Sequence, residues 1–237
     1  MTYACAHRGD NYRAPENTLP AFELALEKGA PQIEFDLRVT SDEEIIVLHD
    51  EKVDRTTNGS GKTTDLTFAQ IRALDAGSWK DARFAGTKLP TFDEVLTLVP
   101  AGVEVNVQLY LAPQYVPRVI ERIKAFNLMD QCFLACPKAH TDIARATDPA
   151  IRICNLEGQR SADSDYPDLT IAMGAEYIQI CGWSDNLAEA TAKLHQHHVK
   201  VNWFGTSEAE MMRKLIKANV DYILTDHLDL CLQVLAE

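Results

Sequence analysis

The sequence has no apolar run approaching the roughly 20 residues that a membrane-spanning helix needs. Its start, Met1 to Tyr3, leads directly into a short apolar segment, without the basic and long apolar regions of a secretory signal. Positive charge is also scarce, because 35 acidic side chains outnumber 23 basic ones and give a net charge of −12. Such a chain repels polyanions, so we expect neither nucleic acid nor a membrane as a partner. These absences predict a cytoplasmic protein and leave open a small anionic substrate, which a locally positive site could bind.

The six cysteines form no CxxC pair of the kind that binds metals. They are scattered through apolar segments, which predicts reduced and buried thiols. The sequence also lacks short-period repeats, low-complexity tracts and Gly/Ser-rich linkers. We therefore expect one domain over residues 1–237, and the oligomeric state stays open between a monomer and a homo-oligomer.

Short apolar segments rich in β-branched residues alternate with amphipathic segments of helical length. This alternation is typical of a parallel sheet built from βα units, and eight strands are enough to close a (β/α)8 TIM barrel. The predicted strands are Tyr3–His7, Gln32–Leu37, Val103–Tyr110, Cys132–Ala135, Ile151–Leu156, Tyr177–Cys181, Val199–Trp203 and Tyr222–Thr225. The predicted helices are Thr18–Glu27, Thr91–Leu98, Tyr115–Phe126, Lys138–Ala146, Pro167–Met173, Leu187–His197, Ser207–Ala218 and Leu228–Leu235.

One segment, from about residue 50 to residue 90, interrupts this alternation after the second predicted strand. It is rich in turn-forming residues, as in the run from Asp54 to Gly61. A loop of this length inside a domain is usually functional. We therefore interpret the segment as an insertion that forms a lid or a wall of a binding cleft.

Titratable residues cluster at the ends of the first predicted strands. His7 and Arg8 stand where the first apolar segment ends, which is the active-site end of a barrel strand. Glu34 and Asp36 are two residues apart in the second strand, so both side chains point to the same face, toward the inside of a closed barrel. Two inward carboxylates need a cation or hydrogen bonds to balance their charge, and Mg²⁺ or Ca²⁺ with its preference for oxygen ligands is the economical explanation. His49 ends the next apolar run, so the two histidines suggest an acid and a base.

Several motifs, in order along the first hundred residues, carry a resemblance to a known family. They are His7-Arg8-Gly9, the run from Ala14 to Phe22, Ile33 to Asp36, His49-Asp50, Asp54 to Thr57, Leu74 to Trp79, and Leu89 to Thr91. This pattern resembles the glycerophosphodiester phosphodiesterase family of TIM-barrel enzymes. In the second half, Trp203 resembles an aromatic residue of the seventh strand and Thr225-Asp226 the motif that closes the eighth.

The resemblance implies metal-dependent hydrolysis of a glycerophosphodiester, or of a similar small phosphodiester, to an alcohol and a phosphomonoester. It implies that Glu34 and Asp36 bind the divalent cation, that Arg8 contacts the phosphate, and that His7 and His49 are the general base and acid. Glu16 and Asn17, which lie in the run from Ala14 to Phe22, are interpreted as residues that order the loop. Trp203 is expected either to line the cleft or to pack in the core.

The third predicted strand departs from the family pattern at two positions. The family usually has a glutamate metal ligand and a phosphate-binding lysine where this sequence has Gln108 and Tyr110. We expect Gln108 to offer a carbonyl oxygen to the metal and Tyr110 to donate a hydrogen bond to the substrate. Two alternatives to the enzyme therefore remain open: a phosphodiester-binding protein with little or no activity, and an enzyme with altered specificity, for example for a sugar phosphodiester.

Overall fold

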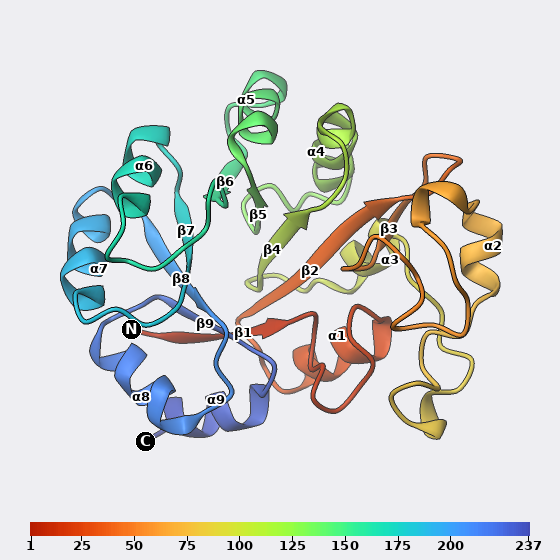
Figure 1. Ribbon diagram of the computed structural model, residues 1–237, viewed down its shortest axis with the longest axis horizontal. Coiled ribbons are helices and arrows are strands. Elements are labelled where there is room, and N and C mark those ends of the chain that lie inside the picture. The colour runs from red at the N-terminus through yellow and green to blue at the C-terminus, as the bar shows by residue number, and fades with distance from the viewer.

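Eight parallel strands close into a barrel in the computed structural model, which describes residues 1–237 (Figure 1). β1 pairs with both β2 and β9, and this pairing joins the first strand to the last. The barrel strands are β1 Tyr3–His7, β2 Gln32–Val39, β4 Glu104–Leu109, β5 Cys132–Cys136, β6 Arg152–Asn155, β7 Tyr177–Cys181, β8 Lys200–Phe204 and β9 Tyr222–Thr225. The predicted TIM barrel is confirmed.

Helices surround the barrel in Figure 1 and cover the outer face of the strands. They are α1 Leu19–Glu27, α3 Phe92–Leu98, α4 Val116–Ala125, α5 Lys138–Thr147, α6 Tyr166–Met173, α7 Leu187–Gln196, α8 Ala209–Lys217 and α9 Leu228–Leu235. Each lies within two residues of its predicted bounds. None of the helices is long and apolar enough to cross a membrane.

The main hydrophobic core lies between the strands and the surrounding helices. It is a single cluster of 47 buried residues. On β2 it takes Ile33, Phe35 and Leu37, and the residues between them point into the barrel, because side chains alternate along a strand. This alternation puts Glu34 and Asp36 inside the barrel, as expected from the sequence.

Glu104 closes the amino-terminal end of the barrel, away from the carboxyl ends of the strands. Its carboxylate accepts hydrogen bonds from Tyr177 at 2.7 Å and Arg152 at 3.0 Å, and Lys200 lies 3.2 Å away. Burial opposes the ionisation of Glu104, but these hydrogen bonds and charges lower its pKa to about 2. This network stabilises the barrel at the end that lacks the site.

The insertion contains more structure than the turn-rich sequence predicted. A short strand, β3 (Ile45–Val47), pairs antiparallel with β2 and leads into the insertion. The insertion itself holds the 3₁₀ turns η1 (Thr63–Asp65) and η2 (Ala82–Phe84) and the helix α2 (Phe68–Ala73), and contributes to a separate cluster of six buried apolar residues. Its hydrogen bonds to the loop between β1 and α1 include those from Lys80 to the Asn11 carbonyl at 2.6 Å and from Arg83 to the Arg13 carbonyl at 2.8 Å.

Candidate active site

The carboxyl ends of β1, β2 and β4 bring most of the predicted site residues together. His7 ends β1 and is in register with Glu34 of β2, and Asp36 of β2 is in register with Gln108 of β4. His7 Nε2 lies 3.9 Å from the Glu34 carboxylate. Because parallel neighbouring strands present register partners side by side, these polar groups share one end of the barrel.

Glu34 and Asp36 form a buried pair of carboxylates inside the barrel. The Arg8 backbone N–H donates to Glu34 Oε2 at 3.0 Å, and the Asn17 amide donates to Asp36 Oδ2 at 2.8 Å. The Arg8 guanidinium forms an ion pair with Asp36, with Nε 3.2 Å from Oδ2. Burial and then the charge of Asp36 raise the pKa of Glu34 well above its usual value.

The free oxygens of this pair fit a divalent cation. Glu34 Oε1 and Asp36 Oδ1 are buried and have no hydrogen-bond partner, although each carboxylate's other oxygen has one. An unpaired buried carboxylate oxygen is costly, and a hard cation would satisfy two of them at once. No set of three His, Cys, Asp or Glu side chains is arranged to hold a metal ion. A third protein ligand would therefore have to be a neutral oxygen, and Gln108 carries one beside Asp36.

His7 is held by a residue from the far end of the chain. Its Nδ1 lies 2.5 Å from Oδ1 of Asp226, which follows β9 and also accepts a hydrogen bond from Asn11. Partial desolvation opposes the ionisation of the half-exposed Asp226 carboxylate, but the hydrogen bond and charge of His7 lower its pKa to about 2. An ionised carboxylate only accepts, so His7 Nδ1 donates to Asp226, and Nε2 is left on the side of Glu34.

His49 has the same arrangement on the opposite side of β2, in the segment that follows β3. Its Nδ1 lies 2.7 Å from Oδ1 of Asp50, and hydrogen bonds from Arg55 hold the pKa of Asp50 well below its usual value. His49 Nδ1 therefore donates to Asp50, and Nε2 is left to act on a ligand. The His49 side chain is partly exposed, whereas His7 is almost fully buried.

Tyr110 lies directly after β4 and lines the site. Its hydroxyl accepts a hydrogen bond from the Gln108 side-chain amide. Its ring packs edge-on against His49, with ring centres 5.1 Å apart, and under the Arg38 guanidinium at 4.8 Å. Burial and the charges of Asp36 and Glu34 raise the pKa of Tyr110. The two residues that depart from the family pattern are thus bonded to each other at the site.

The prediction that Trp203 contacts the substrate is wrong, because its side chain points away from the site. Trp203 belongs to the main core between the barrel and the helices and is 4% exposed, which agrees with the packing alternative. The next residue, Phe204, points the other way, and its ring centre lies 5.0 Å from that of His7. Successive residues of a strand face opposite sides, so Trp203 packs in the core and its neighbour Phe204 is the aromatic residue that faces the site.

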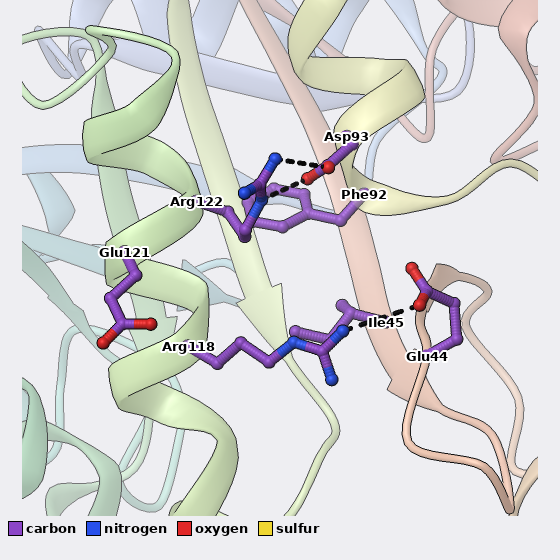
Figure 2. Close-up of a pocket in the computed structure, with 7 residues that line it drawn as sticks. All are labelled: Glu44, Ile45, Phe92, Asp93, Arg118, Glu121 and Arg122. Atoms are coloured by element: carbon purple, nitrogen blue, oxygen red, sulfur yellow. Dashed lines mark hydrogen bonds and ion pairs between the residues drawn. The ribbon is translucent and has the colours of Figure 1, made fainter.

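A separate pocket of about 380 Å³ lies away from the strand ends, between β3, α3 and α4. Figure 2 shows that its two arginines are already paired: Arg122 with Asp93 at the start of α3, and Arg118 with Glu44. The pocket therefore offers no unpaired positive charge to an anionic ligand. It contains none of the predicted site residues.

Comparisons with known proteins point to one family. The model of the glycerophosphoryl diester phosphodiesterase family matches residues 7–230. A glycerophosphodiester phosphodiesterase of Caldanaerobacter subterraneus is 32% identical over 233 residues, which cover 95% of this chain and 94% of that protein.

Solved structures match along the whole chain. A glycerophosphodiester phosphodiesterase of Agrobacterium tumefaciens has a TM-score of 0.83 at 30% identity, over 98% of this chain and 99% of that one. An Oleispira antarctica phosphodiesterase in complex with the product sn-glycerol-3-phosphate has a TM-score of 0.86 over 100% and 98% of the two chains. Its identity is 21%, so it shows a shared fold.

Proposed function

Because the chain belongs to the glycerophosphoryl diester phosphodiesterase family and is thus a hydrolase of phosphodiesters, we propose that it cleaves glycerophosphodiesters, or similar small phosphodiesters, with a divalent cation. The products would be an alcohol and a phosphomonoester such as glycerol 3-phosphate. The observation that carries the proposal is a pair of histidines on either side of the buried carboxylates Glu34 and Asp36. Asp226 holds His7 through Nδ1, and Asp50 holds His49 in the same way.

The two histidines supply the proton transfers in this proposal. One Nε2 takes the proton from the glycerol hydroxyl that attacks the phosphorus, and the other Nε2 donates a proton to the leaving alkoxide. Water then opens the resulting cyclic phosphodiester to give the phosphomonoester. Asp226 and Asp50 keep the imidazoles in the tautomer that leaves Nε2 toward the substrate, and they stabilise the imidazolium when it forms.

Arg8 binds the phosphate in this proposal, because its planar fork of donors matches two phosphate oxygens. Tyr110 donates a hydrogen bond to the substrate, and its exposed ring beside His49 suits that role. Glu34, Asp36 and the Gln108 carbonyl would hold Mg²⁺ or Ca²⁺, which would polarise a phosphoryl oxygen and offset charge in the transition state.

We further propose that residues 1–237 act as one domain and that the protein works in the cytoplasm on soluble substrates from lipid and glycerol metabolism. The continuous 47-residue core supports the single domain. The net charge of −12 supports a small substrate rather than a polyanion.

A second candidate is a phosphodiester-binding protein with an attenuated site. Gln108 in place of a carboxylate favours it, because a neutral oxygen binds a divalent cation more weakly than a charged one. Such a protein would be stabilised thermally by a phosphodiester and would not turn it over.

The test is turnover of a panel that contains glycerophosphodiesters and a chromogenic bis(4-nitrophenyl) phosphate, with Mg²⁺, with Ca²⁺ and with a chelator. We expect cation-dependent hydrolysis that His7→Ala and His49→Ala abolish. His197→Ala is the matched control, since His197 is exposed at the end of α7. No turnover of any member by the folded wild-type protein would reject the enzyme and favour the binding protein.

A further inference from the structure

Arg55 of the insertion lies between two halves of the site, the His49 half with Asp50 and the Arg8 half with Glu16. We propose that it is a positioning residue that couples His49 to Arg8, so that the acid–base histidine and the phosphate-binding arginine are held by one guanidinium. The inference rests on the proposed function of these two residues. The sequence pattern singled out the segment from Asp54 to Thr57 without giving Arg55 a role.

The contacts of Arg55 form two forks. On one side its guanidinium donates to both oxygens of Asp50, with Nε 2.7 Å from Oδ2 and Nη2 3.0 Å from Oδ1. On the other side it donates to both oxygens of Glu16, with Nη1 2.7 Å from Oε2 and Nη2 2.8 Å from Oε1. Bidentate pairs of this kind fix the plane and the distance of both carboxylates, which a lysine with a single ammonium cannot do.

Each of these carboxylates also binds a site residue. Asp50 Oδ1 accepts from His49 Nδ1 at 2.7 Å, and Glu16 Oε1 accepts from Arg8 Nη1 at 2.7 Å. Arg8 in turn pairs with Asp36 inside the barrel. An unbroken chain of charged hydrogen bonds therefore runs from His49 to the buried carboxylates, and Arg55 is its central member.

Charge explains why this position needs a cation. Two carboxylates, Asp50 and Glu16, converge on Arg55, and without it Glu16 would face Arg8 alone and draw the guanidinium away from an incoming phosphate. Burial opposes the ionisation of Glu16, and Arg55 and Arg8 lower its pKa despite this burial. Arg55 comes from the insertion and Glu16 from the loop before α1, so the pairing also joins the insertion to the barrel at the site.

The experiment measures the two halves separately in the full-length protein. Turnover of glycerophosphocholine with Mg²⁺ reports kcat, and calorimetric titration with inorganic phosphate reports the Arg8 half. We expect Arg55→Ala to lower kcat about tenfold and to weaken phosphate binding about tenfold, since small misplacements of catalytic groups carry costs of this order or more. Asp50→Asn should lower kcat and leave phosphate binding unchanged. The double variant should have the kcat of the weaker single variant, because both changes break the same chain.

Arg55→Lys separates position from charge. It keeps the positive charge and loses the two bidentate pairs. Coupling therefore predicts a reduced kcat, and a phosphate affinity between that of the wild type and that of Arg55→Ala. The control is Arg213→Ala, which removes an arginine with a bidentate pair to Glu237 far from the site. Matching melting temperatures would show that the Arg55 variants fold.

The inference is overturned if Arg55→Ala behaves as Arg213→Ala does, if it changes only one of the two halves, or if Arg55→Lys equals the wild type. A wild-type protein without turnover would reject the proposed function alone. In that case phosphate titration and the ¹⁵N shifts of the His49 imidazole still decide the inference, because Arg55→Ala should change both and Arg213→Ala neither.

Discussion

Adding a carboxylate at position 108 should strengthen the proposed cation site and should destabilise the protein when the cation is absent. Gln108 is the register partner of Asp36, so a Gln108→Glu carboxylate would lie about 5 Å from that of Asp36, the spacing of neighbouring strands. At an effective dielectric constant of about 20, two like charges at this distance repel each other by about 3 kcal/mol. Gln108 is partly exposed, and solvent screening leaves about half of that repulsion.

The metal-free variant should therefore lose about 1.5 kcal/mol, which lowers the melting temperature of a protein of this size by about 4 °C. A divalent cation should reverse the sign, because the new carboxylate then faces a charge of +2. We expect its affinity to rise at least about tenfold, equivalent to about 1.4 kcal/mol.

Thermal unfolding with a chelator and with saturating Mg²⁺, together with calorimetric titration of the cation, measures both effects. Gln196→Glu is the control, since Gln196 is exposed on α7 away from the site. The reasoning would be refuted if Gln108→Glu lowered the melting temperature equally with and without the cation and left the affinity unchanged. Position 108 would then lie outside the cation's coordination sphere.

Three further predictions concern the same end of the barrel. Asp226→Asn should lower kcat about a hundredfold because His7 loses the negative charge that fixes its tautomer and stabilises its imidazolium. Because the pKa of Asp226 is lowered to about 2, its contribution to stability is present above about pH 4 and disappears as the pH falls toward 2, so acid unfolding of wild type and variant should converge there. Gly9→Ala should cost more than about 2 kcal/mol in urea unfolding, since Gly9 has φ +78° and a Cβ would lie 2.6 Å from the Ala21 backbone. Gly86→Ala, with φ +84° and no atom within 4 Å, should cost only the backbone strain. Gln108→Glu combined with Tyr110→Lys should raise the turnover of glycerophosphodiesters, and an unchanged rate would show that the natural pair does not attenuate the site.

Much of the barrel could be predicted because its information is local. Strand and helix periodicities depend on neighbouring residues, and parallel strands necessarily collect their carboxyl ends at one side. His7, Glu34 and Asp36 could therefore be assigned to one place from their positions at strand ends.

The rest of the site depends on contacts that no local pattern contains. Asp226 binds His7 across a sequence separation of 219 residues. The bidentate pair between Arg55 and Glu16 could not be predicted, because it depends on the three-dimensional path of the insertion. Trp203 was misplaced because the strand pattern did not settle which of two adjacent aromatic residues, Trp203 or Phe204, faces the barrel interior. For a polar residue the same choice is easier, because a charge such as Glu34 pointing toward the helices would have no partner.

The contact between His7 and Asp226 has a consequence for protein synthesis. The motifs that mark the site are translated first, but the carboxylate that orients His7 follows the strand that closes the barrel. On the ribosome, a nascent chain with β1 and β2 already exposed would carry both histidines and both buried carboxylates without an oriented His7. The proposed proton-transfer group is therefore oriented by the same event that closes the barrel, and we expect no hydrolysis before β9 has joined β1.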